Sequence, residues 1–142
     1  MPNLVIDASV YAKWFNRGEE FEEEALRLRD EFVNGKVEFH APSHIIFETC
    51  NAIWKNPNVT DADALKLAKE VIVLKPGILE LDQEMTEEAM RLARLEKVSF
   101  YDMTYVAIAK KLAFALITAD DKQCGIAKRH VECRHLKEGY PL

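Results

Sequence analysis

Apolar residues in this chain form short runs that alternate with longer segments of helical periodicity. Runs typical of buried strands lie at residues 3–6, 37–40, 78–81, 115–118 and near 131–135. Segments with apolar positions every three or four residues, or with a capping residue at their start, lie at about 8–16, 20–34, 43–55, 60–75, 82–96, 99–112 and 121–129. Strands that alternate with helices predict an α/β fold with a parallel, doubly wound sheet.

The composition is that of one ordinary globular domain. The chain has 142 residues, of which 49% are hydrophobic and 30% are charged. A chain of this length and balance can bury a core of its own, and it contains no linker, repeat or low-complexity stretch. We therefore expect a single domain over residues 1–142.

The apolar runs and the cysteines bear on where the protein works. No run approaches the ~20 residues that a membrane-spanning helix needs, and the first residues lack the basic start of a signal peptide. The cysteines are odd in number and form no CxxC pair, which is typical of reduced thiols. We expect a cytoplasmic protein that has no membrane partner.

The acidity of the chain is concentrated in one predicted helix. The formal net charge is −5. Residues 19–31 hold seven acidic and two basic side chains, so this segment alone has a charge of −5 and the rest of the chain sums to zero. The total charge therefore does not exclude a nucleic-acid substrate, which local bases or bound cations could hold.

Four acidic side chains stand where a parallel sheet would gather them. Asp7 follows the strand at 3–6, and Asp120 follows the strand at 115–118. Asp102 lies in the first turn of a helix, and Glu48 lies one turn into another. Ligands of such sheets bind beyond the carboxyl ends of the strands. Carboxylates without a glycine-rich phosphate loop predict a site for Mg²⁺ or Mn²⁺. Two such ions can activate water against a phosphodiester.

Each acid also has a purely structural interpretation. Asp7 and Asp120 could cap the helices that follow them, and Asp102 could belong to a capping box. On a helical wheel Glu48 falls opposite the apolar positions, where a solvated glutamate is common. Taken together, these interpretations weaken, because all four acids can meet at one edge of the sheet.

The ordered set of motifs resembles the PIN domain family, and in particular its small VapC-type toxins. The resemblance spans residues 3 to about 136. It rests on four motifs in order: Asp-x-Ser (Asp7, Ser9), Glu-x-x-Asn (Glu48, Asn51), Tyr-Asp-x-x-Tyr (Tyr101, Asp102, Tyr105) and Thr-x-Asp (Thr118, Asp120).

The resemblance implies a fold, an activity and partners. The fold would be a three-layer α/β/α arrangement around a central parallel sheet of about four to five strands. The activity would be metal-dependent endonucleolytic cleavage of RNA that leaves 5′-phosphate and 3′-hydroxyl ends, as in the toxin of a type II toxin–antitoxin pair. A small antitoxin protein would be a partner, and the chain would form a homodimer.

The resemblance also assigns roles to residues. The catalytic, metal-binding acids would be Asp7, Glu48, Asp102 and Asp120. The supporting residues would be Ser9, Thr118, Asn51 and Asp121, the last as a possible substitute for Asp120. Basic side chains that could contact RNA phosphates are Lys13, Arg17 and Lys122, although a solvated surface position is the more common role for each.

Aromatic residues and histidines near the acids have two possible roles. The tyrosines Tyr11, Tyr101 and Tyr105 could stack on bases, but their helical spacing favours the core or a supporting position behind the site residues. His44 lies four residues before Glu48 without the HExxH motif, which makes it a surface residue or a neighbour of the acidic site. A loose cluster near the end of the chain, Cys124, His130, Cys133 and His135, matches no zinc-binding spacing, so we expect no zinc.

Other functions remain open at this level. A housekeeping RNA-processing nuclease of the same family would show the same motifs. A receiver-like signalling domain could use Asp7, Thr118 and Lys122 with Mg²⁺, but it needs a phosphoacceptor after its middle strand, where only Asp82 is available. An inactive RNA-binding domain would have no need for the intact set of acids.

Overall fold

The computed structural model describes residues 1–139 and contains a sheet of five parallel strands. The strands are β1 (Asn3–Ile6), β2 (Glu38–Pro42), β3 (Gly77–Leu79), β4 (Ala115–Thr118) and β5 (Cys133–His135). They lie in the order β3-β2-β1-β4-β5. The chain therefore builds the sheet outward from β1 in one direction and then, after β3, in the other.

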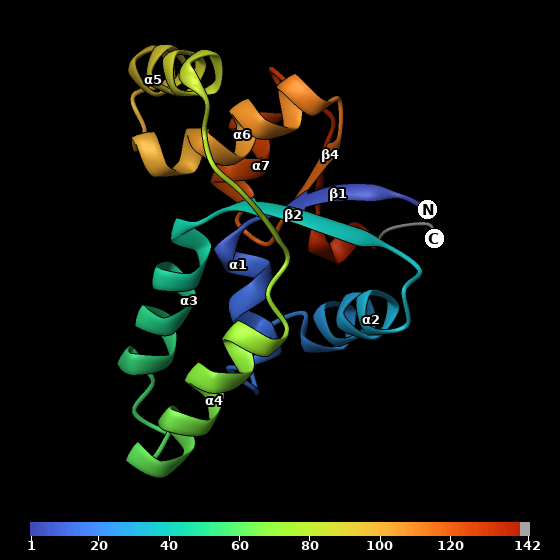
Figure 1. Ribbon diagram of the computed structural model, residues 1–142, viewed down its shortest axis with the longest axis vertical. Helices are drawn as coiled ribbons and strands as arrows, with labels where there is room; N and C mark the ends of the chain where they lie inside the picture. Colours follow the sequence, from blue (N-terminus) through green and yellow to red (C-terminus); the bar gives the residue numbers. More distant parts are fainter. Residues whose placement is uncertain (140–142) are drawn as a thin grey trace.

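Helices cover both faces of this sheet. The α-helices are α1 (Ala8–Tyr11), α2 (Glu22–Val33), α3 (His44–Lys55), α4 (Asp61–Val73), α5 (Gln83–Glu96), α6 (Phe100–Leu112) and α7 (Asp121–Ala127). Short 3-10 helices are η1 (Ala12–Trp14) and η2 (Leu136–Glu138). Figure 1 shows α1–α4 on one side of the sheet and α5 and α6 on the other. The predicted three-layer α/β/α architecture is confirmed, with five strands at its centre.

The central strands are buried because helices cover them on both sides. Leu4, Val5 and Ile6 of β1 are at most 1% exposed, as are Leu116 and Ile117 of β4. This explains why these strands are continuous apolar runs and do not alternate with polar residues. In register, Ile6 pairs with Ile117, so β1 and β4 end side by side at the same edge of the sheet.

The elements differ from the predicted ones mainly at their ends. The helix expected over residues 8–16 is a single α-helical turn followed by η1, which sets Tyr11 and Trp14 edge to face with ring centroids 5.0 Å apart. Phe21 enters α2 in the left-handed region at φ 62°, which no sequence signal indicated. Across residues 1–139, none of the helices has the length and apolar character that crossing a membrane requires.

Candidate active site

The four predicted acids line one cleft beyond the carboxyl ends of β1 and β4. These two strands form the topological switch point, where the connections turn from one direction to the other, and crevices open at such points. The cleft has a volume of about 320 Å³. Its lining residues are Asp7, Ala8, Ser9, Glu48, Val98, Ser99, Asp102, Tyr105, Asp120, Lys122, Gln123 and Ile126.

Asp7 is the most deeply buried of the acids, at 5% exposed. Its Oδ1 accepts hydrogen bonds from the backbone N–H of Ser9 at 3.1 Å and from the Ser9 hydroxyl at 2.5 Å. Asp7 therefore caps α1 and also lines the cleft. Burial raises the pKa of Asp7 to about 6, against the lowering effect of hydrogen bonds from Ser9 and Thr118.

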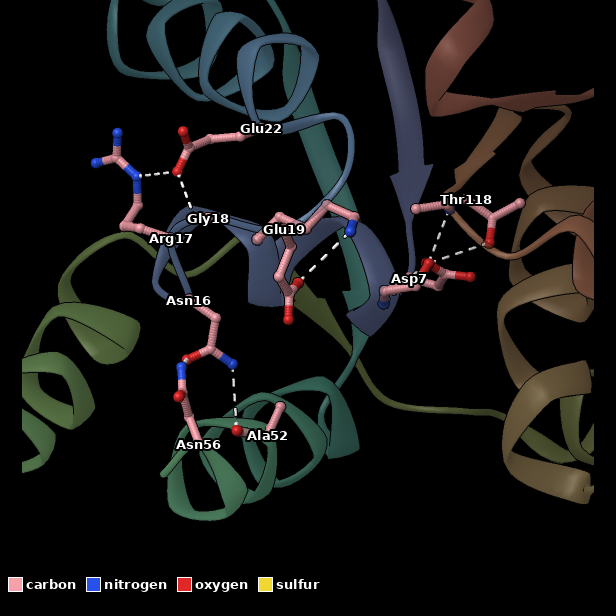
Figure 2. A network of polar contacts seen from close by, with 12 residues as sticks. Asp7, Asn16, Arg17, Gly18, Glu19, Glu22, Ala52, Asn56 and Thr118 are labelled. Carbon is pink, nitrogen blue, oxygen red and sulfur yellow. Dashed lines mark hydrogen bonds and ion pairs between the residues drawn. The ribbon is translucent and has the colours of Figure 1, made fainter. Parts of the chain in front are cut away.

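Ser9 and Thr118 join the ends of β1 and β4 around this carboxylate. Ser9 Oγ accepts from the backbone N–H of Ala119 at 2.8 Å and lies 3.2 Å from Thr118 Oγ1. Thr118 Oγ1 in turn accepts from the backbone N–H of Asp120 at 3.2 Å. Figure 2 shows Asp7 and Thr118 side by side at this junction. The two hydroxyls fix Asp7 relative to the turn that carries Asp120.

Asp102 and Asp120 lie at the starts of two neighbouring helices. Asp102 is in the first turn of α6, and Asp120 is the N-cap residue of α7. The Asp102 N–H donates to Ser99 Oγ at 3.1 Å, and Asp120 Oδ1 accepts from the Gln123 N–H at 2.8 Å. The Gln123 side chain donates to the Asp102 carbonyl at 3.0 Å, which ties α7 to α6. Burial raises the pKa of Asp102, and the charges of Glu48 and Asp120 raise it further.

Glu48 reaches the cleft from α3 on the opposite side. Its Oε1 lies 2.7 Å from His44 Nδ1 and accepts from the Tyr105 hydroxyl at 2.8 Å. Burial, with the Glu48 carboxylate nearby, raises the pKa of Tyr105. Glu48 is thus held by two side chains at the edge of the cleft, with its side chain 37% exposed.

Asn51 and Asp121 lie outside the cleft. Asn51 is exposed on α3 and is not among the lining residues. The Asp121 side chain is 81% exposed and pairs with His135 Nε2 at 3.4 Å and Lys137 Nζ at 3.3 Å. Of the two neighbouring aspartates it is Asp120 that faces the cleft.

The three candidate RNA-binding bases differ in position. Lys122 lines the cleft itself. Lys13 lines an adjoining hollow of about 390 Å³ that shares Ser9, Glu48 and Asp120 with the cleft, and its Nζ lies 3.5 Å from Glu19. Arg17 lines neither hollow and pairs with Glu22 at 2.7 Å, as Figure 2 shows.

The tyrosines separate into two groups. Tyr11 and Tyr105 are buried as their spacing predicted, and the Tyr11 hydroxyl donates to the Val71 carbonyl at 2.6 Å. Tyr101 is 60% exposed, so of the two predicted positions it does not lie in the core. It stands in the first turn of α6, where its ring contacts the edge of His44.

The chemistry of the cleft fits a hard divalent cation. The available donors are carboxylate oxygens. Burial raises the pKa of Asp7 and of Asp102, and the charges of neighbouring carboxylates raise it further, an effect that a bound cation would relieve. Within residues 1–139 no group of three or more His, Cys, Asp or Glu side chains is arranged to hold a metal ion. Oxygen donors of this kind are the ligands that Mg²⁺ takes, and the ion keeps several of its waters when protein carboxylates bind it.

The fold and the cleft define a member of a known family. The sequence matches the PIN domain family over residues 4–129, and the chain belongs to that family. The resemblance seen in the motifs is thereby confirmed.

Individual relatives extend this similarity. Ribonuclease VapC3 of Pyrobaculum aerophilum is 29% identical over 121 residues, which cover 82% of this chain and 88% of that protein. VapC20 of Mycobacterium tuberculosis, described as a toxin that cleaves the sarcin–ricin loop, superposes with a TM-score of 0.66 at 18% identity over 86% of this chain and 93% of that chain. VapBC-5 of the same organism, described as a member of a family of toxin–antitoxin systems, gives a TM-score of 0.57 at 17% identity over 95% of this chain and 98% of that chain.

Proposed function

We propose that this protein is an endoribonuclease that uses Mg²⁺ or Mn²⁺ to cleave RNA phosphodiesters, and that it is the toxin of a toxin–antitoxin pair. The observation that supports this most directly is the convergence of Asp7, Glu48, Asp102 and Asp120 on one cleft at the switch point of the sheet. Membership in the PIN domain family and similarity to a ribonuclease support the type of reaction.

The residues of the cleft have distinct roles in this proposal. Asp7, Asp102 and Asp120 would hold one cation, and Glu48 would contact a second. The cation supplies Lewis-acid stabilisation and the activation of water for attack at phosphorus. Ser9 and Thr118 keep the Asp7 carboxylate in place, and Lys122 attracts the RNA backbone to the same side.

The partners follow from the relatives. The printed descriptions of VapC20 and VapBC-5 name a toxin and a toxin–antitoxin system, which supports a small antitoxin as the partner of this chain. An arginine from such a partner could pair with the acids of the cleft and occupy it. We further propose that the chain acts in the cytoplasm and forms a homodimer.

Purified protein should cleave single-stranded or structured RNA with Mg²⁺ or Mn²⁺ and leave 5′-phosphate ends. Asp7→Asn should abolish cleavage, and Asp63→Asn, an exposed aspartate of α4, should leave it unchanged as the matched control. Cleavage that persists in EDTA or in Asp7→Asn would contradict the mechanism. Expression of the active protein in a bacterial host should arrest growth, whereas normal growth with active enzyme would favour a housekeeping nuclease.

A further inference from the structure

His44, at the start of α3, is fixed on both edges of its ring. Its Nδ1 lies 2.7 Å from Glu48 Oε1, and its Nε2 lies 2.7 Å from Thr104 Oγ1 of α6. The rings of Tyr101 and Tyr105 contact the His44 ring edge to face, with ring centroids 5.1 and 5.2 Å from its own. The imidazole therefore has one orientation, and it bridges the helix that carries Glu48 to the helix that carries Asp102.

The direction of these hydrogen bonds follows from counting donors. The single hydroxyl proton of Thr104 goes to the Tyr101 carbonyl, which can only accept, at 2.6 Å. Thr104 Oγ1 must then accept from His44, so Nε2 is protonated. On the other edge of the ring, Nδ1 lies within hydrogen-bond distance of the Glu48 carboxyl, so the two side chains share one hydrogen bond.

The contact with His44 also restricts which Glu48 oxygen is available. Oε1 has two hydrogen-bond partners, His44 Nδ1 and the Tyr105 hydroxyl, the latter at 2.8 Å. In residues 1–139 no hydrogen bond is formed by Oε2. The Glu48 side chain is 37% exposed, so without these partners it could take several rotamers, each with its oxygens elsewhere.

We propose that His44 is the positioning residue of Glu48: it holds Oε1 against α6 and leaves Oε2 for a cation in the cleft. This inference rests on the proposed function, since it concerns the same acids. Partners that orient a ligand carboxylate contribute about 10- to 100-fold to metal affinity or activity. His44 is not a catalytic residue, because it acts through Glu48.

Two variants separate positioning from a structural role of His44. An asparagine amide nitrogen stands as far from Cα as Nδ1 does, so His44→Asn retains the hydrogen bond to Glu48. A glutamine amide nitrogen matches Nε2 instead, so His44→Gln retains the contact with Thr104 and loses the one with Glu48. Each variant thus keeps one of the two hydrogen bonds.

Calorimetric titration with Mn²⁺ alone, without RNA, gives the first readout. We expect His44→Asn to bind within about threefold of wild type and His44→Gln to bind about tenfold or more weakly. With RNA, His44→Gln should lower kcat and leave KM unchanged. Equal affinities for all three proteins, or a greater loss in His44→Asn, would overturn the inference and leave the proposed function standing.

Wild-type protein labelled with ¹⁵N-histidine gives a second readout that needs no folded variant. Addition of Mg²⁺ should shift the His44 resonances and leave those of His40, which bonds to Asn3, unchanged. An unshifted His44 would overturn the inference. Cation binding without RNA cleavage would overturn the proposed function, while the order of Mn²⁺ affinities would still decide the role of His44. A wild type that binds no cation would overturn both.

Discussion

The Ser9 hydroxyl donates to Asp7 Oδ1 across 2.5 Å and at the same time accepts from the Ala119 backbone N–H. One side chain thus joins the catalytic candidate at the end of β1 to the turn after β4. Ser9→Ala should lower cleavage about 10- to 100-fold, because Asp7 loses its orienting donor. It should also destabilise the protein by about 1–3 kcal/mol, since the Ala119 N–H loses its partner. Ser9→Thr, which keeps the hydroxyl, is the control, and equal activity of both variants would contradict the role of Ser9.

Asp7→Asn should stabilise the metal-free protein even though it abolishes cleavage. The folded carboxyl has a pKa of about 6, against 3.8 for the ordinary group. Folding therefore favours the protonated form of Asp7. The stability that this protonated carboxyl contributes is complete below pH 3.8 and is lost as the pH rises through about 6. At pH 8 the ionised, buried carboxylate costs up to about 3 kcal/mol that the neutral amide avoids. Thermal unfolding in EDTA should show a higher Tm for the variant at pH 8 and equal values near pH 4.

Glu88 should show the opposite pH dependence. Hydrogen bonds from Arg91 and from Lys110 Nζ, the latter at 2.7 Å, lower the pKa of Glu88 to about 2. Its contribution is therefore complete above the ordinary value of 4.5 and is lost as pH falls toward 2. Glu88→Gln should cost roughly 0.5–1 kcal/mol at pH 7, because the ion pairs lie near the surface. Denaturant unfolding of wild type and variant at pH 7 and below pH 3 tests this. The same difference in free energy of unfolding at both pH values would contradict the prediction.

Asp120 and Asp121 should respond very differently to the same substitution. Asp120 lines the cleft, while Asp121 turns outward to His135 and Lys137. Asp120→Asn should reduce cleavage by at least about 100-fold, since a candidate cation ligand is lost. Asp121→Asn should retain activity within about twofold. The reverse order in an RNA cleavage assay would identify Asp121 as the fourth acid.

Lys122 should contribute to RNA binding, and Arg17 should not. Lys122 lines the cleft, whereas Arg17 is paired with Glu22 and lies outside both hollows. Lys122→Ala should weaken RNA binding and lower the slope of log affinity against log salt by about one. Arg17→Ala should leave both quantities unchanged. Fluorescence anisotropy with labelled RNA over a range of salt concentrations measures the affinity and its salt dependence. EDTA in the buffer prevents cleavage of the RNA during the measurement.

The fold could be predicted because local and long-range signals agree. The apolar runs that predicted β1 and β4 are the strands that helices bury on both sides. Capping residues gave the helix starts: Ser99 Oγ accepts from the Asp102 N–H, and Asp82 Oδ1 accepts from the Met85 N–H. The 3-10 turn of η1 had no such signal, because it depends on how the rings around Tyr11 pack.

The site could be predicted only in part. The acids after β1 and β4 follow from topology, because the carboxyl ends of parallel strands share an edge. The orientation of α3 did not follow, since its buried face includes the polar Thr49, which lies beside Ile45 and Ile53. With that face inward, Glu48 reaches the cleft and Asn51 faces solvent.

Side-chain pairings across helices left no trace in the sequence. The Gln123 bond to the Asp102 carbonyl depends on where α7 lies against α6. The contact between His44 and Thr104 likewise depends on how α3 meets α6. Residues 21 and 60 positions apart form these pairs, and no local periodicity connects them.

The strand order has a last consequence for how the protein could be silenced. Asp7 and Asp120 belong to adjacent strand ends, yet most of the chain, including β2, β3 and the six helices α1–α6, is traversed between them. The site forms only where β1 pairs with β4, so a fragment that ends before β4 keeps Asp7 and lacks the Asp120 side of the cleft. Truncation before β4 is thus enough to take the site apart.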